Sequence, residues 1–275
     1  MSTEHVPQES KRKYEMLVVS QHNRSCVIKF NRQDKLNAMN LQMAGELRDA
    51  LTAAEMDRNI ISVILCGDER SFCVGADLEG MKTDPDMRFD AYRALFNVAP
   101  NRQLFRVLCF FTKPIISAVE GYCLGGGLEI ALWGDLIIGG EAASFGLPEA
   151  RRGLIPGAGG TQNLTRLIGP ARAKELIWTG RRISGAEAKE YGILNHLVLK
   201  GQALEKAQTI ADEMAECGPL AIMMSKQSIN RGIDQSRYYG FLAEADLAHM
   251  LTFSEDRREG LQAFSEKRRP NFTGK

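Results

Sequence analysis

The sequence has almost no net charge, no long apolar run and no clustered pattern of metal ligands. Its 35 Lys and Arg residues are balanced by 34 Asp and Glu residues, which leaves a formal net charge of +1. This balance gives no general reason to expect nucleic acid or an anionic membrane as the partner. No apolar stretch approaches the roughly 18 residues of a membrane-spanning helix. A membrane protein and a general nucleic-acid binder are therefore both disfavoured.

Cysteine and histidine are scattered through the chain. The six cysteines form no C-x-x-C pair and mostly occur in apolar runs, so we expect buried free thiols in a reducing compartment. The four histidines show no spacing typical of a metal site, and no metal is expected. The cysteines are Cys26, Cys66, Cys73, Cys109, Cys123 and Cys217.

Residues 1–13 are polar and contain no apolar segment of the kind found in a secretory signal. We expect them to form a disordered leader, as is common at chain ends. They include Glu4 and Glu9 and do not form an Arg-rich amphipathic pattern. These features predict an intracellular protein and favour the cytoplasm over the mitochondrion.

The order of predicted elements indicates an α/β fold. With 275 residues, of which 44% are hydrophobic, the chain can bury a large core. Strands alternate with helices up to about residue 200, which is typical of β-α-β units. We therefore expect an α/β body over 14–200 and a helical C-terminal region over 201–275. Predicted strands are 16–20, 25–30, 60–66, 114–119, 135–138 and 193–199, with a loop at 67–77. Predicted helices include 41–56, with Asn40 as its N-cap, 128–133, 170–179 and a short helix after a capping box at 184–187.

The most informative segment is a glycine run over residues 121–129 that ends in Glu129. Three consecutive glycines carry an entropic cost, which suggests a close backbone approach or unusual backbone angles. A following helix would offer unsatisfied N–H groups and a positive end to an oxygen that gains negative charge. The purely structural alternatives are a tight turn for the glycines and, for Glu129, a charge that complements the helix dipole.

A second carboxylate, Glu149, follows Pro148 in a predicted turn. Alone, it could be an ordinary surface acid. The apolar neighbours of Glu129 favour burial of that carboxylate and a raised pKa. The glycine-rich segment 157–162 completes the group, and neither glycine segment fits a dinucleotide or P-loop motif. Two acids beside exposed backbone donors are suited to moving protons around an oxyanion.

This constellation resembles the enoyl-CoA hydratase/isomerase, or crotonase, family. The resemblance extends from about residue 16 to residue 272. The segments that carry it are 35–40 (KLNAMN), 71–78 (SFCVGADL), 121–129 (GYCLGGGLE), 145–149 (FGLPE), 153–162 (GLIPGAGGTQ) and 179–184 (TGRRIS).

The resemblance implies a crotonase-like ββα superhelix body with a helical trimerisation region. It also implies hydration of a 2-enoyl-CoA thioester to a 3-hydroxyacyl-CoA. Glu129 and Glu149 would be the catalytic acids, with the backbone N–H groups of Ala76 and Gly126 as the oxyanion hole. Substrate contacts implied by the family are Ala76, Asp77, Leu78, Glu79 and Gly126.

Further implications concern partners and cofactors. Family members are commonly homotrimers or dimers of trimers, and Phe264 and Lys267 would either touch the adenine nucleotide of CoA or belong to a solvated basic tail. CoA enters as part of the substrate, and the family chemistry uses no metal or redox cofactor. The alternatives are an isomerase or another reaction on a CoA thioester, and an RNA-binding relative. The basic residues that motivate the RNA alternative are Arg151, Arg152, Arg166, Arg172, Lys174, Arg181 and Arg182.

Overall fold

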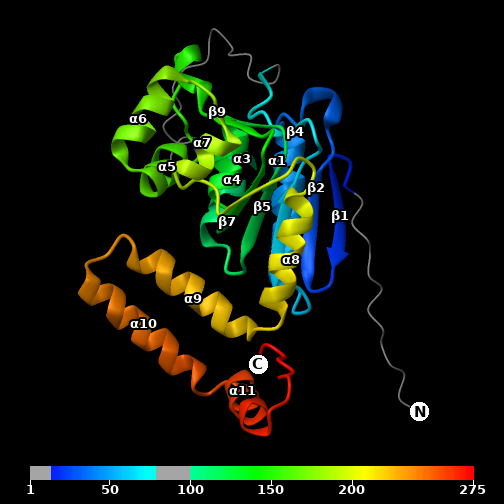
Figure 1. Cartoon of the computed structure of the whole chain (residues 1–275), viewed down its shortest axis with the longest axis vertical. Helices are drawn as coiled ribbons and strands as arrows, with labels where there is room; N and C mark the ends of the chain where they lie inside the picture. Colours follow the sequence, from blue (N-terminus) through cyan, green and yellow to red (C-terminus); the bar gives the residue numbers. More distant parts are fainter. Residues whose placement is uncertain (1–13, 79–99) are drawn as a thin grey trace.

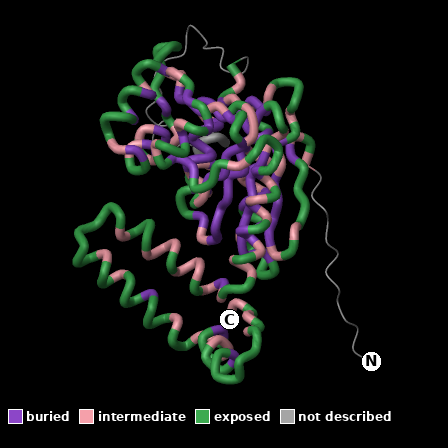
Figure 2. Tube along the Cα trace, in the orientation of Figure 1, coloured by how far each residue is buried: buried purple, intermediate pink, exposed green. Residues whose placement is uncertain are grey.

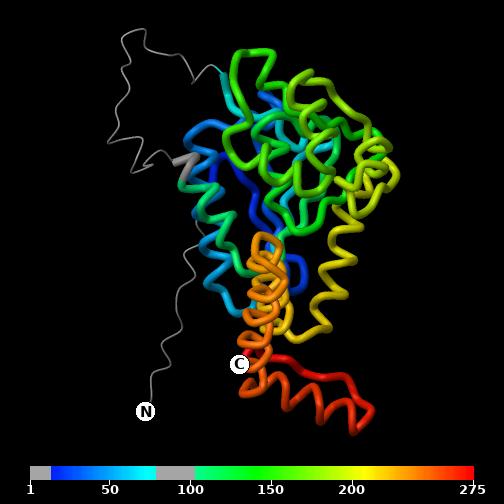
Figure 3. Tube along the Cα trace, turned by 90° about the vertical axis from the view of Figure 1, so that its left-hand side faces the viewer, coloured from blue at the N-terminus to red at the C-terminus, as the bar shows by residue number. Residues whose placement is uncertain are grey.

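The computed structural model describes residues 14–78 and 100–275 of the chain. The expected α/β class is confirmed: a body of sheets and helices forms the upper part of Figure 1, and helices α9 to α11 extend from it. Figure 3 shows the same separation after a quarter turn. Within the described residues no helix is long and apolar enough to cross a membrane.

The main sheet contains six strands in the order β1-β2-β3-β5-β7-β10. The two N-terminal strands form an antiparallel hairpin, and the other neighbouring strands are parallel. Asn23 turns the hairpin with a positive φ of 49°, which asparagine tolerates better than most residues. The strands are β1 (Leu17–His22), β2 (Ser25–Phe30), β3 (Ser62–Cys66), β5 (Ile115–Val119), β7 (Leu136–Gly140) and β10 (His196–Val198).

A smaller sheet of four short strands, in the order β4-β6-β8-β9, stands beside the main sheet. Its first strand lies inside 67–77, so the prediction of a continuous loop there is wrong. Strands of two or three residues are too short to show an alternating pattern, which is why the sequence does not reveal them. They are β4 (Ser71–Cys73), β6 (Tyr122–Leu124), β8 (Ser144–Gly146) and β9 (Ile183–Ser184).

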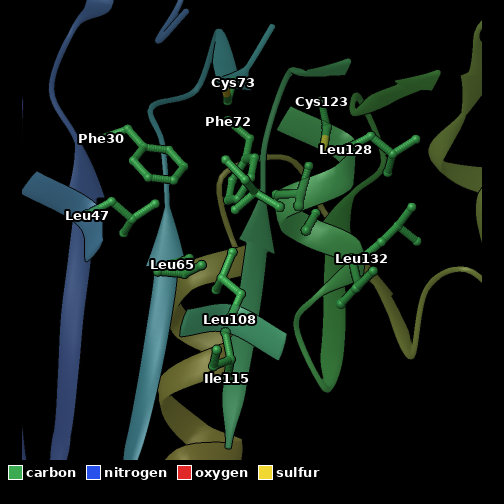
Figure 4. Packing of buried hydrophobic residues seen from close by; sticks show 14 of the residues in the cluster. Phe30, Leu47, Leu65, Phe72, Cys73, Leu108, Ile115, Cys123, Leu128 and Leu132 are labelled. Atoms are coloured by element: carbon green, nitrogen blue, oxygen red, sulfur yellow. The ribbon is translucent and has the colours of Figure 1, made fainter. Parts of the chain in front are cut away.

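Helices cover both faces of the main sheet. On one face, α1 (Leu41–Met56) and α3 (Pro100–Phe110) pack together, and the core there includes Leu47, Leu65 and Phe72. Figure 4 shows these side chains with those of α4 (Gly126–Leu132). On the other face, α8 (Ala203–Ala215) contributes small residues to a second cluster. Successive strand residues alternate between the two clusters, as the period of a strand requires.

The predicted start of α1 is confirmed in detail. Asn40 accepts a hydrogen bond from Met43 N at 2.8 Å, which satisfies one of the free donors at the helix start. At the other end, the buried Lys113 donates from Nζ to the carbonyls of Ala54 and Asp57, both at 2.6 Å. Both ends of the helix are therefore satisfied by side chains.

Three helices, α5 to α7, occupy residues 160–190. The capping box predicted at 184–187 is present at the start of α7 (Gly185–Glu190). The helix predicted over 170–179 is α6 (Pro170–Thr179). It packs against the preceding α5 (Gly160–Ile168).

The C-terminal helices have few buried residues, as the colours of Figure 2 show. They are α9 (Pro219–Gly232), α10 (Arg237–Leu251) and α11 (Glu255–Glu266). Lys226 ties α9 to the body, because its Nζ donates at 2.8 Å to both the Lys113 carbonyl and Asp135 Oδ2. Large apolar side chains remain exposed along these helices.

Four of the six cysteines are buried, as predicted, and all six are free thiols. Burial raises the pKa of Cys26 and of Cys66 to about 11 and that of Cys73 to about 12. The prediction is wrong for Cys109 and Cys217, which are exposed. Cys109 lies in α3 and Cys217 just after α8, and each of these helices packs against the core with its opposite face. Residue type alone does not reveal which face of a helix a cysteine occupies.

Candidate active site

The glycine run connects β6 to α4, which begins at Gly126, two residues before the predicted start. Gly125 has φ 53° and ψ −130°, a conformation that is essentially restricted to glycine. Gly127 lies against β4: a Cβ at residue 127 would stand 2.1 Å from the carbonyl oxygen of Cys73. The run is therefore required by backbone geometry at one position and by close packing at another.

Two backbone N–H groups at this point have no acceptor among the residues that the structure describes. Met39 forms a parallel bridge with Ala76 in which Met39 N donates to Gly75 O and Asp77 N donates to Met39 O. The Ala76 N–H therefore points to the other side, and Gly126 N lies in the first turn of α4, where no intrahelical acceptor exists. A Cβ on Gly126 would stand 3.7 Å from Ala76 N. The two donors are thus neighbours, and neither is used within the described residues.

Glu129 is the buried acid of α4, with 4% of its surface exposed. Its Oε1 accepts hydrogen bonds from Ala158 N at 2.7 Å and Gly160 N at 2.9 Å. No described residue donates to Oε2. Burial raises the pKa of Glu129 above the ordinary value of 4.5, and the two backbone hydrogen bonds oppose that rise.

Glu149 belongs to a short 3-10 helix, Pro148–Arg152, that follows β8. Its Oε2 is buried and has no hydrogen-bond partner among the described residues. Burial raises the pKa of Glu149. A hydrogen bond from its own backbone N–H opposes the rise, the charge of Glu129 adds to it, and Arg152 lowers it. The charge of Glu129 acts on Glu149, so the two carboxyl groups are near enough to interact although they come from different elements.

The predicted site residues fall into three groups. The structure brings Ala76, Gly126, Glu129 and Glu149 together around the start of α4. The carboxylate of Asp77 forms an ion pair with Arg32 at 2.6 Å, so it anchors the loop that carries Ala76. Leu78 is 53% exposed. Glu79 lies outside the described residues.

Sequence reasoning missed the clamp on Glu129, by which we mean the two hydrogen bonds that Ala158 N and Gly160 N donate to its Oε1. The segment 157–162 is rich in glycine, but nothing in its composition says which acceptor its N–H groups meet. Trp133, the C-cap of α4 one turn after Glu129, donates from Nε1 to Ala158 O at 2.7 Å. The one sequence signal for an unusual backbone here is the high glycine content of the segment. Gly159 does adopt a positive φ of 108°.

The basic residues behind the RNA alternative are largely engaged within the chain. Arg166 pairs with Asp234, and Arg181 pairs with Glu175 and Glu187. Arg172 and Arg182 lie over aromatic rings. These contacts give no support to a basic binding stripe. Nor is there, in the described residues, a group of three or more potential ligands that could hold a metal ion.

Known proteins are similar to this chain over most of its length. The family model described as Enoyl-CoA hydratase/isomerase matches residues 21–275. A 2,3-dehydroadipyl-CoA hydratase of Escherichia coli is 37% identical over 259 residues, which cover 94% of this chain and 99% of that protein. An enoyl-CoA hydratase domain-containing protein 2 of Bos taurus is 39% identical, covering 90% of this chain and 83% of that protein.

Solved structures show the same likeness. The crystal structure of an enoyl-CoA hydratase from Bacillus anthracis superposes with a TM-score of 0.87 at 39% identity, covering 95% of this chain and all of that one. The expected crotonase-like fold is therefore confirmed. A family model that spans most of the sequence, together with relatives of this identity and coverage, assigns the chain to the enoyl-CoA hydratase/isomerase family.

Proposed function

We propose that this protein adds water across the C2–C3 double bond of a 2-enoyl-CoA thioester to give a 3-hydroxyacyl-CoA. The observation that carries the proposal is the pairing of Glu129 and Glu149, both with raised pKa values, beside the two free N–H groups of Ala76 and Gly126. Relatives named as hydratases support it.

In this proposal the thioester oxygen accepts hydrogen bonds from Ala76 N and Gly126 N. Withdrawal of electron density makes C3 electrophilic and stabilises the enolate-like species that forms when water attacks. One such donor is typically worth about 3 to 4 kcal/mol in the transition state. The dipole of α4 adds only a small contribution, since the helix has just seven residues.

The glutamates handle the protons. One glutamate, as the carboxylate, removes a proton from water while the water oxygen bonds to C3. The other glutamate, as the protonated acid, delivers a proton to C2. The elements of water are added and no electrons are gained or lost. The two groups are close enough to interact, so their titration belongs to the pair. A raised pKa shifts a carboxyl group toward its protonated form, which favours its action as an acid.

The proposal places CoA in the substrate and uses no metal or redox cofactor. The loop that follows β4 would line the CoA pocket, with Leu78 and Glu79 in contact with substrate. The role of Asp77 would be indirect, because its carboxylate is paired with Arg32.

We also propose that the protein assembles as a homotrimer or a dimer of trimers through α9 to α11. Exposed apolar side chains gather on these helices in a number unusual for a surface that faces only water. They are Ile229, Ile233, Tyr238, Tyr239, Phe241, Leu242, Met250, Phe253, Leu261 and Phe264. Helix α11, which carries Phe264 and ends at the C-cap Lys267, lies far from α4 (Figure 1), so contact of these two residues with CoA would involve a neighbouring subunit.

Incubation with crotonyl-CoA tests the function, because hydration removes the absorbance of the conjugated thioester. We expect turnover by the natural sequence and a loss of about 10²- to 10⁴-fold in Glu129→Gln and in Glu149→Gln. If natural protein and both variants are equally inert on a panel of enoyl-CoAs, the proposal fails. Migration of the double bond without water uptake would identify an isomerase. A salt-sensitive RNA shift without turnover would favour the binding protein.

A further inference from the structure

Trp133, the C-cap of α4, lies one turn after Glu129, and its N–H donates to Glu129 O at 3.2 Å. Both side chains reach the same neighbouring segment, residues 158–160. The carboxylate accepts from Ala158 N and Gly160 N, and the indole donates to Ala158 O at 2.7 Å. One helix face therefore holds this segment by two different side chains.

These hydrogen bonds involve three consecutive peptide groups. The first carries the Ala158 N–H and the third carries the Gly160 N–H, and both donate to Oε1 of Glu129. The middle peptide carries the Ala158 carbonyl, which accepts from Trp133. A displacement of the middle peptide would shift the two α-carbons that it shares with the flanking peptides, and so would move both N–H groups relative to Oε1.

The indole ring also packs against the segment. A Cβ on Gly159 would stand 2.8 Å from Nε1 and 2.9 Å from Cε2 and Cζ2 of Trp133. The lack of a side chain at Gly159 allows this approach, and its positive φ of 108° turns the chain into α5. Trp133 is partly buried against the main core cluster, so the ring itself is held in place.

We propose that Trp133 is a positioning residue: its indole N–H fixes the middle peptide of residues 158–160, keeps two N–H donors on Oε1 of Glu129, and so reserves Oε2 for proton transfer. This inference rests on the proposed function of Glu129. It assigns a role to a side chain that does not itself touch the substrate.

Loss of the Trp133 hydrogen bond should change the pKa of Glu129. Its two N–H bonds stabilise the charged carboxylate and oppose the effect of burial. Loosening the clamp removes part of that stabilisation and raises the pKa further. The charged side chain that faces Glu129 from the 148–152 segment is Glu149, itself influenced by Arg152; α5 and the 158–160 segment contribute backbone N–H groups.

The test compares Trp133→Phe with Trp178→Phe. The chain has two tryptophans, and Trp178 is 71% exposed on α6, so it is the matched control. We expect Trp133→Phe to lower kcat about tenfold with little change in KM, as for the loss of one hydrogen bond near the reacting groups. The limb of the pH profile that Glu129→Gln removes should move to higher pH. Trp178→Phe should behave like the natural sequence.

Two results would overturn the inference. In one, kcat and the pH profile of Trp133→Phe match those of the control. In the other, kcat falls but the Glu129 limb stays in place, which would mean that the ring only supports packing. If Trp133→Phe does not fold, β-(3-benzothienyl)alanine at residue 133 in the Trp178→Phe background removes the N–H and keeps the shape.

A measurement that needs no turnover separates this inference from the proposed function. In protein labelled with ¹³C at the glutamate carboxyl carbons, the Glu129 signal is assigned from its loss in Glu129→Gln and titrated. The clamp inference requires a higher pKa in Trp133→Phe than in Trp178→Phe, and an equal pKa would refute it. A protein that hydrates no enoyl-CoA yet shows this difference would refute only the proposed function.

Discussion

Oε1 of Glu149 lies over the backbone of Gly125: a Cβ added to that glycine would stand 3.1 Å from the oxygen. Such a separation is tighter than ordinary van der Waals contact. The same glycine has a φ of 53° and precedes the free N–H of Gly126. The absence of a side chain at residue 125 therefore has two effects. It leaves room for the carboxylate of Glu149, and it allows the backbone angles with which α4 begins.

Gly125→Ala should damage activity more than stability. The new methyl group would press on Glu149 and shift Gly126 N, so we expect a loss of about 10²-fold in kcat/KM. Backbone strain should cost about 1 to 3 kcal/mol of unfolding free energy. Gly192→Ala is the control, since Gly192 has a φ of 87° and nothing within 4 Å of its added Cβ. Equal losses of activity in both variants would contradict the contact with Glu149.

The two buried acids should make stability depend on pH. Their pKa values are raised above 4.5 in the folded protein, so the native state holds protons more tightly than the unfolded chain. The free energy of unfolding should therefore fall as pH rises from about 4.5 through the raised values. Urea titrations at a series of pH values would measure the slope. The double variant Glu129→Gln with Glu149→Gln should show a smaller slope, and an unchanged slope would contradict this reading.

Asn40→Ala should destabilise the protein without altering the site. The Asn40 side chain accepts from Met43 N at the start of α1, and loss of such a cap costs about 1 kcal/mol. Asn40→Asp retains the acceptor and should remain close to the natural sequence in a urea titration. A destabilisation by Asn40→Asp as large as that by Asn40→Ala would show that the cap is unimportant.

The proposed assembly can be tested at Phe241, which is 63% exposed on α10. If the C-terminal helices form the subunit interface, Phe241→Ser should weaken association at least about 30-fold, as expected for a large apolar side chain at an interface centre. Size-exclusion chromatography with light scattering would detect the smaller species. Met56→Ser, at a 79% exposed residue of α1, should leave the mass unchanged. Identical masses for all three proteins would argue against this interface.

Much of the fold could be predicted because its signals are local. The cap at Asn40 and the apolar face of 41–56 define α1, and the continuous apolar run before residue 66 defines β3. Pro170 and the capping box at 184–187 mark two further helix starts. Each depends on residues within a few positions of one another, which is the range that periodicity and capping rules cover.

The missed features depend on tertiary contacts. Strand β4 pairs with β6, about 50 residues later in the chain, and contains only three residues. The bond from Trp133 to Ala158 joins positions 25 residues apart. Pairing between Glu129 and Glu149 was anticipated from the family resemblance rather than from spacing. Burial and partner choice arise only when distant segments meet, so composition near each residue cannot supply them.

The two unused N–H groups at residues 76 and 126 belong to the main chain. A mutation changes side chains, so it can displace these donors but cannot delete them, except by introducing proline. In the proposed function, oxygen recognition is thereby separated from the side chains at 129 and 149, which would carry out the proton transfers. This separation makes the scaffold a good starting point for enzyme design: residues 129 and 149 can be exchanged for other acids, bases or nucleophiles while the polarising element is inherited intact.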